Sequence, residues 1–303
     1  MQATTLPTHS PANPSQEEET RPLAPGLYLV STPIGNLEDI TLRALRILAF
    51  ADRIACEDTR QSHKLLHHHG IATPTVSLHA HNEGDRTPEL LAELAQGARI
   101  AVISDAGTPG ISDPGMHLTS AAIAAGIPVH PIPGPNAALT ALVASGLPVE
   151  RFAFHGFLPE KAGARRTQLE YLARSSDKAT LLFYEAPHRI LDTLSDLATL
   201  WPQARVVVAR ELTKLHEEFL RGTAAELRQT LAARERVRGE IVLLLETGGQ
   251  PPEPQAQTIA ARVTELMASE SLNEKDALKR AARERNLGKS EAYRELQRER
   301  GKR

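Results

Sequence analysis

Residues 103–115 read ISDAGTPGISDPG, and the apolar segment Ile100 to Ile103 leads directly into this run. Four apolar residues in a row indicate a buried strand, which the glycines and prolines end abruptly. In an open α/β sheet, ligands bind at the carboxyl ends of the strands. A loop of small residues at that place, with Asp105 near its start, therefore predicts a ligand pocket.

Two further loops have the same character. Residues 31–36 read STPIGN and follow the first apolar segment of the chain, and residues 131–137 read PIPGPNA and follow another apolar segment. Glycine and proline punctuate chains at turns, so each of these loops is expected to end a strand. Three such loops are hard to explain by packing alone, which favours a shared binding site.

Apolar segments alternate with helical patterns along most of the chain, which predicts an α/β fold with a mostly parallel first sheet. The first series of expected strands is 27–30, 53–56, 75–78, 100–103 and 129–132, with helices at 42–50, 63–69, 89–96, 118–125 and 137–144. The second series is 152–157, 181–184, 206–210, 217–221 and 241–246, with helices at 165–174, 190–200 and 224–233. Residues 217–221 are expected to form an antiparallel strand.

The composition changes along the chain and suggests five segments. Residues 1–25 are rich in proline and predict a disordered extension, and the run GGQPPEP at the start of 248–255 is typical of a linker. Between them we expect an N-terminal α/β domain at 26–148 and a C-terminal α/β domain at 149–247. Residues 256–303 are expected to form a small, basic helical tail.

The composition also limits where the protein works. The single cysteine, Cys56, excludes a disulfide scaffold and fits a reducing compartment. The N-terminal residues lack the pattern of a secretion signal, and no apolar run reaches the roughly 18 residues that a membrane helix needs. We therefore expect a cytoplasmic protein without a membrane partner.

The charge of the tail differs from that of the whole chain. Residues 271–303 hold 11 Lys and Arg residues against 6 Asp and Glu residues, although the net charge of the chain is only −2. A solvated helix face with i,i+4 ion pairs is the common interpretation of such a tail. Binding of a polyanion by the tail becomes the better interpretation only if other parts of the chain also indicate a polyanionic ligand.

Six motifs follow one another along the chain and together indicate a family. They read TPIGNLEDIT at 32–41, CEDTR at 56–60, DAGTPGISDPG at 105–115, PGPNA at 133–137, FYEAPHR at 183–189 and RELTK at 210–214. This set resembles the ribosomal small-subunit RNA 2′-O-methyltransferases that modify a cytidine of the decoding centre, a branch of the tetrapyrrole methylase superfamily. The resemblance covers about residues 26–246 and is weaker in the helical tail.

The resemblance implies a homodimer and two α/β domains of the tetrapyrrole methylase type, with S-adenosylmethionine in the cleft between them. Backbone amides of small residues can approach such a ligand, and a carboxylate can balance its positive charges. The implied cofactor contacts are Pro33, Asp105, Ala106, Gly107, Ile111, Asn136, Ala137, Tyr184, Leu212 and the neighbourhood of Glu240. Asp105 could instead bond its own backbone in a turn, and Tyr184 could simply pack in the core.

Methyl transfer to a ribose hydroxyl gains from a base, because the hydroxyl is barely ionised at neutral pH. Glu57, Asp58 and Glu185 follow expected strands and are the carboxylate candidates for this role, with His81 and His188 as alternatives. Each carboxylate could instead form an ion pair that holds a loop in place, and the sequence leaves this open.

Substrate contacts are expected from the same motifs. Arg60 and Arg189 carry planar donor forks that suit phosphate, and Arg210 could do the same. His81, Asn82 and His188 are expected to contact the nucleotide. The runs HHH at 67–69 and HAH at 79–81 lack a third ligand at a suitable spacing, so we expect no metal site.

Two other functions fit part of the pattern. A methyltransferase acting on a tetrapyrrole or another small molecule would share the fold and the cofactor but would need no basic tail. A nucleotide-binding regulator without enzymatic activity would need no polar groups around a transfer point. The polar groups Glu57, Asp58, Glu185 and His188 argue against the regulator. The porphyrin and corrin methylases of the superfamily carry a more glycine-rich first loop and lack the motif at 57–60, so the resemblance favours ribosomal RNA as the substrate.

Overall fold

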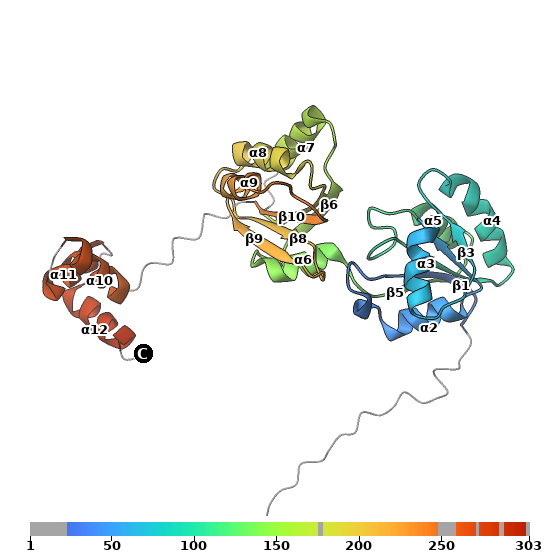
Figure 1. Ribbon diagram of the computed structural model, residues 1–303, viewed down its shortest axis with the longest axis horizontal. Helices are drawn as coiled ribbons and strands as arrows, with labels where there is room; N and C mark the ends of the chain where they lie inside the picture. Colours follow the sequence, from blue (N-terminus) through green and yellow to red (C-terminus); the bar gives the residue numbers. More distant parts are fainter. Residues whose placement is uncertain (1–22, 175–177, 248–258, 271–272, 285–287, 301–303) are drawn as a thin grey trace, which may run out of the picture. The chain divides into compact units, whose positions relative to one another are not determined.

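A computed structural model of the chain describes residues 23–174, 178–247, 259–270, 273–284 and 288–300. The chain forms two compact units, residues 1–247 and 248–303. In the described part of the first unit the strands form two five-stranded sheets, so the predicted α/β class is confirmed (Figure 1). Most of the extension 1–25 and all of the linker 248–255 lie outside the described residues.

The first sheet is parallel throughout and has the strand order β3-β2-β4-β1-β5. Because all five strands run in one direction, the loops that follow them emerge at one edge of the sheet. The predicted run of residues 100–103 lies in its central strand, β4. The strands are β1 (Gly26–Val30), β2 (Arg53–Cys56), β3 (Thr75–Ser77), β4 (Arg99–Ile103) and β5 (Val129–Ile132).

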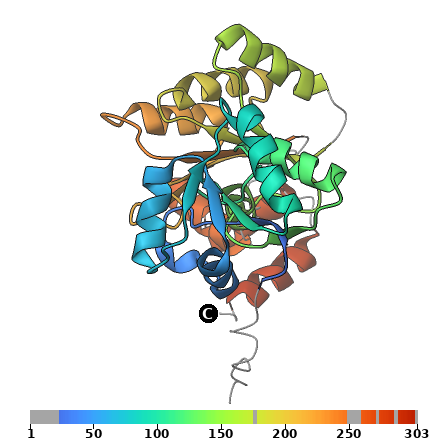
Figure 2. The same ribbon diagram turned by 90° about the vertical axis from the view of Figure 1, so that its right-hand side faces the viewer.

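Helices cover both faces of this sheet, which explains why its strands are apolar on both sides. Along β4, Ala101 and Ile103 pack with α2 and α3, whereas Ile100 and Val102 pack with α4 and α5. Figure 2 shows these helices, coloured blue to green, on either side of the strands. They are α2 (Leu42–Phe50), α3 (Thr59–His68), α4 (Glu83–Ala95) and α5 (Met116–Ala124), with a short 3-10 turn, η1 (Leu37–Asp39), before them.

The second sheet is mixed and has the order β6-β7-β10-β8-β9. Only the β6 and β7 pair is parallel, and β9 pairs with β8 in the antiparallel direction expected for residues 217–221. The strands are β6 (Phe152–Phe157), β7 (Thr180–Glu185), β8 (Val206–Arg210), β9 (Glu218–Gly222) and β10 (Ile241–Glu246).

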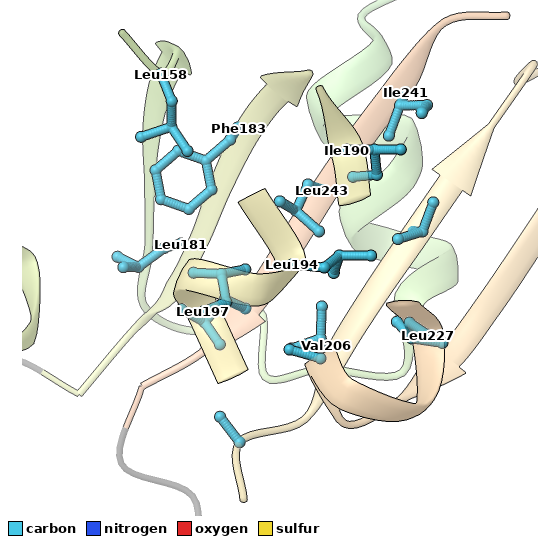
Figure 3. Packing of buried hydrophobic residues seen from close by; sticks show 14 of the residues in the cluster. Leu158, Leu181, Phe183, Ile190, Leu194, Leu197, Val206, Leu227, Ile241 and Leu243 are labelled. Carbon is cyan, nitrogen blue, oxygen red and sulfur yellow. The ribbon is translucent and has the colours of Figure 1, made fainter. Parts of the chain in front are cut away.

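One face of the second sheet is covered by α7 (Ala162–Arg174), α8 (Ile190–Leu200) and α9 (Ala224–Ala232). Figure 3 shows Ile190, Leu194 and Leu197 of α8 packed over Phe183 of β7 and Leu243 of β10. The opposite face is covered by α6 (Ala137–Ser145), whose Ala138, Ala141 and Leu142 are buried against it. Although α6 follows the last strand of the first sheet in sequence, it thus packs on the second sheet. The domain boundary at residue 148 stays a prediction.

Four helices, α3, α4, α5 and α7, begin earlier than the sequence pattern predicts, and the difference is largest for α3 and α4. α3 begins at Thr59 rather than at residue 63, because the Asp58 side chain accepts a hydrogen bond from the amide of Arg60 and caps the helix. α4 begins at Glu83 and contains Pro88, whereas we expected a start after this proline. The Asn82 side chain closes the preceding turn by accepting from the amide of His79 at 2.8 Å.

The second unit is a small helical bundle, as predicted for the tail. α10 (Ile259–Glu270), α11 (Glu274–Glu284) and α12 (Lys289–Arg300) share a small core of leucines, alanines and other aliphatic residues. Ile259 packs with Ala292 and Leu296, and Val263 packs with Ala277. Lysines and arginines lie on the outside of this unit, at Lys275, Lys279, Arg283 and Arg298.

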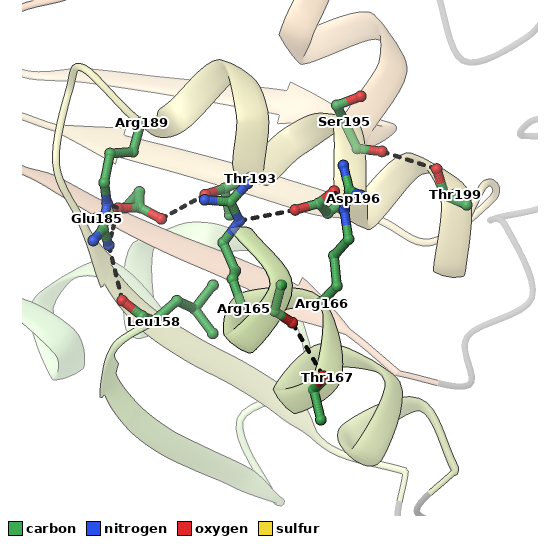
Figure 4. A network of polar contacts seen from close by, with 11 residues as sticks. Leu158, Arg165, Arg166, Thr167, Glu185, Arg189, Thr193, Ser195, Asp196 and Thr199 are labelled. Atoms are coloured by element: carbon green, nitrogen blue, oxygen red, sulfur yellow. Dashed lines mark hydrogen bonds and ion pairs between the residues drawn. The ribbon is translucent and has the colours of Figure 1, made fainter. Parts of the chain in front are cut away.

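A buried ion pair fixes α7 on α8. The Arg165 guanidinium donates to Asp196 at 2.8 Å, and the two side chains are only 4% and 7% exposed. Arg166 donates to the other oxygen of the same carboxylate at 2.8 Å (Figure 4). Both oxygens of Asp196 are therefore used to compensate for burial of the charges.

We expect Asp196→Ala to lower the free energy of unfolding by about 3–5 kcal/mol, because it leaves the buried Arg165 charge without its partner. Asp192→Ala is the matched control: Asp192 lies one turn earlier on α8 and is exposed, so a change below about 0.5 kcal/mol is expected. Urea unfolding followed by circular dichroism measures both. Equal losses in the two variants would contradict the stabilising role of the pair.

Candidate functional site

A cavity of about 470 Å³ lies between the loops at the carboxyl edge of the first sheet and residues of the second sheet. Its volume is within the range of about 300–1,000 Å³ typical of small-molecule sites. The lining residues are Ile34, Glu57, Asp105, Ala106, Gly107, Thr108, Ile111, Ser112, Asp113, Ala137, Phe157, Tyr184, Glu185, Ala186, Pro187, Leu212, Gly239, Glu240, Ile241 and Val242.

The loop at 105–115 forms one wall of the cavity. Hydrogen bonds near its start join it to the neighbouring loops after β1 and β2. Gly107 and Thr32 exchange two backbone hydrogen bonds, of 2.8 and 3.1 Å, which join the loop after β4 to the loop after β1. One Asp105 carboxylate oxygen accepts from the amide of Asp58 at 3.2 Å, which adds the loop after β2. Three strand-terminal loops are thus connected, two of them by backbone bonds and the third through the Asp105 carboxylate.

The other end of this loop is held by a buried carboxylate. Glu83, at the start of α4, accepts hydrogen bonds from the amides of Gly115, His117 and Leu118 at 2.9, 3.0 and 3.4 Å. Gly115 is the N-cap of α5 with φ of 118°, a conformation that excludes most side chains, and it has no side chain with which to cap the helix. Glu83 supplies the missing cap from another helix.

The second sheet contributes an aromatic wall. The Tyr184 ring meets the rings of Phe154 and Phe157 edge-on, at centroid distances of 4.8 and 5.5 Å. Phe157 follows an irregularity in the pairing of β6 with β7 and is 56% exposed, although it is a large apolar side chain that lines the cavity. An aromatic face left open in a cavity can stack on a planar ring of a ligand.

The loop after β8 closes the site from the other side. Its Glu211 and Thr213 have φ of 53° and 65°, which is rare for residues other than glycine. Lys214 donates to Glu211 and Glu240 at 2.9 and 3.0 Å and holds this conformation. A second cavity, of about 370 Å³, lies next to this loop and shares Ile34, Asp105, Ala106 and Glu240 with the first one.

Acidic side chains gather in the first cavity. Burial raises the pKa of Glu57, and the nearby Asp105 and Asp58 carboxylates raise it further, while His79 opposes the shift. Burial likewise raises the pKa of Asp113, with help from the Glu57 and Asp105 charges, to about 6. The cavity therefore favours a ligand that carries positive charge or that gives up a proton.

Most of the cofactor residues predicted from the resemblance meet in one place. Asp105, Ala106, Gly107, Ile111, Ala137, Tyr184 and Leu212 all line the first cavity. Pro33 lines the second cavity. Asn136 is not among the lining residues: its side chain caps α6 by accepting from the amide of Leu139 at 3.1 Å and donates to Thr108 at 3.4 Å.

The three predicted catalytic carboxylates differ in what they contact. Glu57 lines the cavity and is partly exposed. The Glu185 side chain is fully buried, accepts from Arg189 and the amide of Ala186 at 2.8 Å each, and accepts from Thr193 at 2.6 Å (Figure 4). A carboxylate with these donors already bonded has little capacity left for a substrate proton, which argues against Glu185 as a base.

Asp58 and Arg60 pair with each other at the surface. Two guanidinium nitrogens of Arg60 donate to the two Asp58 oxygens at 3.1 and 3.0 Å, and this contact lowers the pKa of Asp58. Because Asp58 also caps α3, its contacts are those of a structural residue. Arg60 is 88% exposed in its side chain and remains accessible to a phosphate.

The other predicted substrate residues do not meet at the cavity. Arg189 is 12% exposed in its side chain and donates to Glu185 and to the Leu158 carbonyl, so its donor fork is largely used within the protein. Asn82 closes the turn before α4. His81 and His188 are exposed and do not line either cavity.

Among the residues that the structure describes, no group of three or more His, Cys, Asp or Glu side chains is placed to hold a metal ion. None of the described helices is both long and apolar enough to cross a membrane.

Sequence reasoning missed several residues of the site. Thr108, Ser112 and Asp113 belong to the strand-terminal run 103–115, but the motifs gave them no role. Asp113 is the clearest omission, because an acidic residue directly before a Pro-Gly pair in a strand-terminal loop is itself a signal. Phe157 and Glu83 carried no signal in the sequence, since their roles depend on contacts with other segments.

Comparison with known proteins identifies relatives over most of the chain. The family model described as Tetrapyrrole (Corrin/Porphyrin) Methylases matches residues 26–228. The "Ribosomal RNA small subunit methyltransferase I" of Halalkalibacterium halodurans is 48% identical over 271 residues, which cover 88% of this chain and 93% of that protein. The protein of the same name from Pasteurella multocida is 50% identical over 253 residues, covering 83% and 89%.

A solved structure with the same fold is more distant in sequence. The crystal structure of uroporphyrin-III C-methyltransferase from Thermus thermophilus, complexed with S-adenosyl homocysteine, matches with a TM-score of 0.50 at 22% identity. The match covers 72% of this chain and 96% of that one. At this level of identity the likeness concerns the fold, which supports the predicted two-domain architecture of the tetrapyrrole methylase type.

We expect Gly35→Ala to disturb the contact between the loops after β1 and β8. A Cβ atom at Gly35 would lie 2.5 Å from Lys214 Cγ and 2.9 Å from the Leu212 carbonyl oxygen, so the backbone must move. Overpacking of this kind lowers the free energy of unfolding by about 1–3 kcal/mol. Gly84→Ala, in α4 with open space around it, is the control and should be neutral or stabilising by up to about 1 kcal/mol. Thermal unfolding of both variants tests this, and equal midpoints would contradict it.

Proposed function

The chain belongs to the ribosomal RNA small subunit methyltransferase I family of the tetrapyrrole (corrin/porphyrin) methylases, and from this we propose how its site works. The protein is an S-adenosylmethionine-dependent methyltransferase that acts on the ribose 2′-oxygen of a cytidine in the decoding centre of small-subunit ribosomal RNA. The observation that carries the proposal is the first cavity, in which the family's motifs from both α/β domains meet.

The cavity suits this cofactor in shape and charge. Ile34, Ile111 and Leu212 offer apolar surface, and Ala106 and Gly107 let backbone amides approach a ligand closely. Asp105 and Glu57 can balance the positive charges of the sulfonium and amino groups. The thermophilic relative in complex with S-adenosyl homocysteine has the same fold, which supports the choice of ligand.

The residues of this chain contribute mainly by alignment. When bound, the cofactor supplies an electrophilic methyl group on a sulfonium. The walls of the cavity would orient the two reactants and exclude water, and such alignment is a large gain for a displacement of this kind. Among the three carboxylates predicted as catalytic, Glu57 alone keeps its side chain in the cavity without a bonded arginine.

The alternative substrate, a tetrapyrrole or another small molecule, is not favoured. Relatives that are 48% and 50% identical over most of the chain carry the name of a ribosomal RNA methyltransferase, whereas the tetrapyrrole enzyme shares 22% identity. The charged helical unit at 259–300 fits the same conclusion. Its exposed Lys275, Lys279 and Arg283 lie on α11 and suit a contact with phosphates.

The proposal also covers the oligomeric state of the protein and the compartment in which it works. We propose a homodimer, as the resemblance implies, and its molar mass in solution can be measured by light scattering. We also propose that the protein acts in the cytoplasm, where small ribosomal subunits assemble.

The proposed activity has a direct test. Purified protein is incubated with labelled S-adenosylmethionine and small-subunit particles from a strain that lacks the enzyme, and the labelled nucleotide is mapped. We expect one 2′-O-methylated cytidine in the decoding centre. Label on a base, at another position, or in no RNA at all would refute the proposal.

Removal of residues 248–303 should weaken RNA binding without changing cofactor affinity. Because phosphate contacts release counterions, we also expect a flatter dependence of RNA affinity on salt concentration. The triple variant Lys275→Ala, Lys279→Ala and Arg283→Ala keeps the helical unit and should show the same trend to a smaller extent. RNA titrations at several salt concentrations measure this. An unchanged affinity and slope would mean that the charged face is only solvated.

A further inference from the structure

Asp113 lines the first cavity near the end of the loop at 105–115. It follows Ser112, which has φ of 63°, and precedes Pro114 and Gly115. The loop that carries it is fixed at one end by the Thr32 and Gly107 backbone pair and at the other by Glu83. A side chain on so constrained a loop is presented to the cavity in a defined place.

The surroundings of Asp113 combine both walls of the cavity. From the first sheet's loops the carboxylates of Glu57 and Asp105 act on it and raise its pKa, while the Ser104 hydroxyl opposes the shift. From the second sheet Tyr184 lines the same cavity, and burial and the Asp113 charge raise the pKa of this tyrosine. Among the described residues, the charged groups that act most strongly on Asp113 are therefore both carboxylates.

This arrangement differs from that of the other acidic candidates. Asp58 is bonded to Arg60 at the surface, and Glu185 is bonded to Arg189 and Thr193 in the interior. Glu57 faces His79, which favours its charged form. Asp113 also lines the cavity, and burial together with the neighbouring carboxylates raises its pKa to about 6, which suits a base at neutral pH.

We propose that Asp113 is the catalytic base that accepts the proton of the attacking ribose hydroxyl, with Glu57 as the neighbour that tunes it. The inference rests on the proposed function, since it needs a hydroxyl substrate in the cavity. The bond between the ribose oxygen and the methyl carbon forms as the carbon–sulfur bond breaks, and the electron pair of that bond stays on sulfur. The hydroxyl proton passes to an Asp113 carboxylate oxygen and leaves to water after release of the product.

The pH dependence of the rate follows from this role. A base must be ionised, so kcat/KM should fall as the pH drops through the pKa of Asp113 in the free enzyme, near 6, and should level off above it. Glu57→Gln removes a charge that raises the pKa of Asp113. The fall in kcat/KM should therefore occur at a lower pH in that variant. At higher pH, where kcat/KM is constant, the variant should keep a substantial rate.

The decisive variant is Asp113→Asn, which keeps the shape of the side chain and removes its ability to take a proton. We expect the single-turnover methylation rate to fall by about 100- to 10,000-fold and the limb near pH 6 to disappear. The affinity for S-adenosyl homocysteine, measured by calorimetry, should change less than about threefold. Asp85→Asn, an exposed position in the first turn of α4, is the control and should behave as the wild type.

A second readout does not depend on activity. In wild-type protein labelled with ¹³C at the aspartate carboxyls, one resonance should titrate near pH 6, and Asp113→Asn should remove it. This measurement also applies if the variant folds poorly, because the wild-type titration and the wild-type pH profile remain available.

Three results would overturn the inference. The first is a methylation rate and pH limb in Asp113→Asn equal to those of the wild type. The second is a loss of rate in Glu57→Gln as large as the one expected for Asp113→Asn, which would make Glu57 the base. The third is a flat wild-type profile between pH 5 and 7. Failure of the wild-type protein to methylate the particle is a separate result, which refutes the proposed function and this inference together.

Discussion

The shape of the loop at 105–115 is the constraint on which the site depends. Backbone bonds from Thr32 hold its beginning, and the Glu83 carboxylate holds its end by capping α5. Small residues and left-handed conformations let the loop turn tightly, and its buried Gly107, Pro109 and Gly115 lie against neighbouring segments. Its order therefore comes from groups on other segments, and these segments also determine where the carboxylates of the cavity lie.

Much of the fold can be predicted from the sequence pattern, because short connections between buried strands and helices permit only a few arrangements of these elements. β2, β5, β6, β8 and β10 have the bounds expected from the apolar runs. The starts of α3 and α4 were wrong because capping by Asp58 and the turn at Asn82 depend on single side chains. The site was predicted less completely. Proximity to a strand end identified Glu57 and Asp105, but it could not show that Glu185 and Arg189 would bond to each other.

The acidic residues of the cavity are placed at a cost to the stability of the protein, because they bring like charges together. Glu57, Asp105 and Asp113 line one cavity, and burial raises the pKa of Glu57 and of Asp113. A core selected for stability alone would avoid such a cluster. A ligand with positive charge would relieve the repulsion, so the residues that reduce the stability of the empty protein would favour binding of such a ligand.

The position of α6 has a consequence for synthesis of the chain. This helix is completed before any strand of the second sheet exists, yet its Ala141 and Leu142 bury one face of that sheet, including Leu182, Val207 and Leu244. During synthesis, α6 has therefore left the ribosome before the strands that it covers are made. A fragment that begins after α6 would expose this apolar face and tend to aggregate, so the two halves of the first unit cannot be separated at the boundary that their sequences suggest.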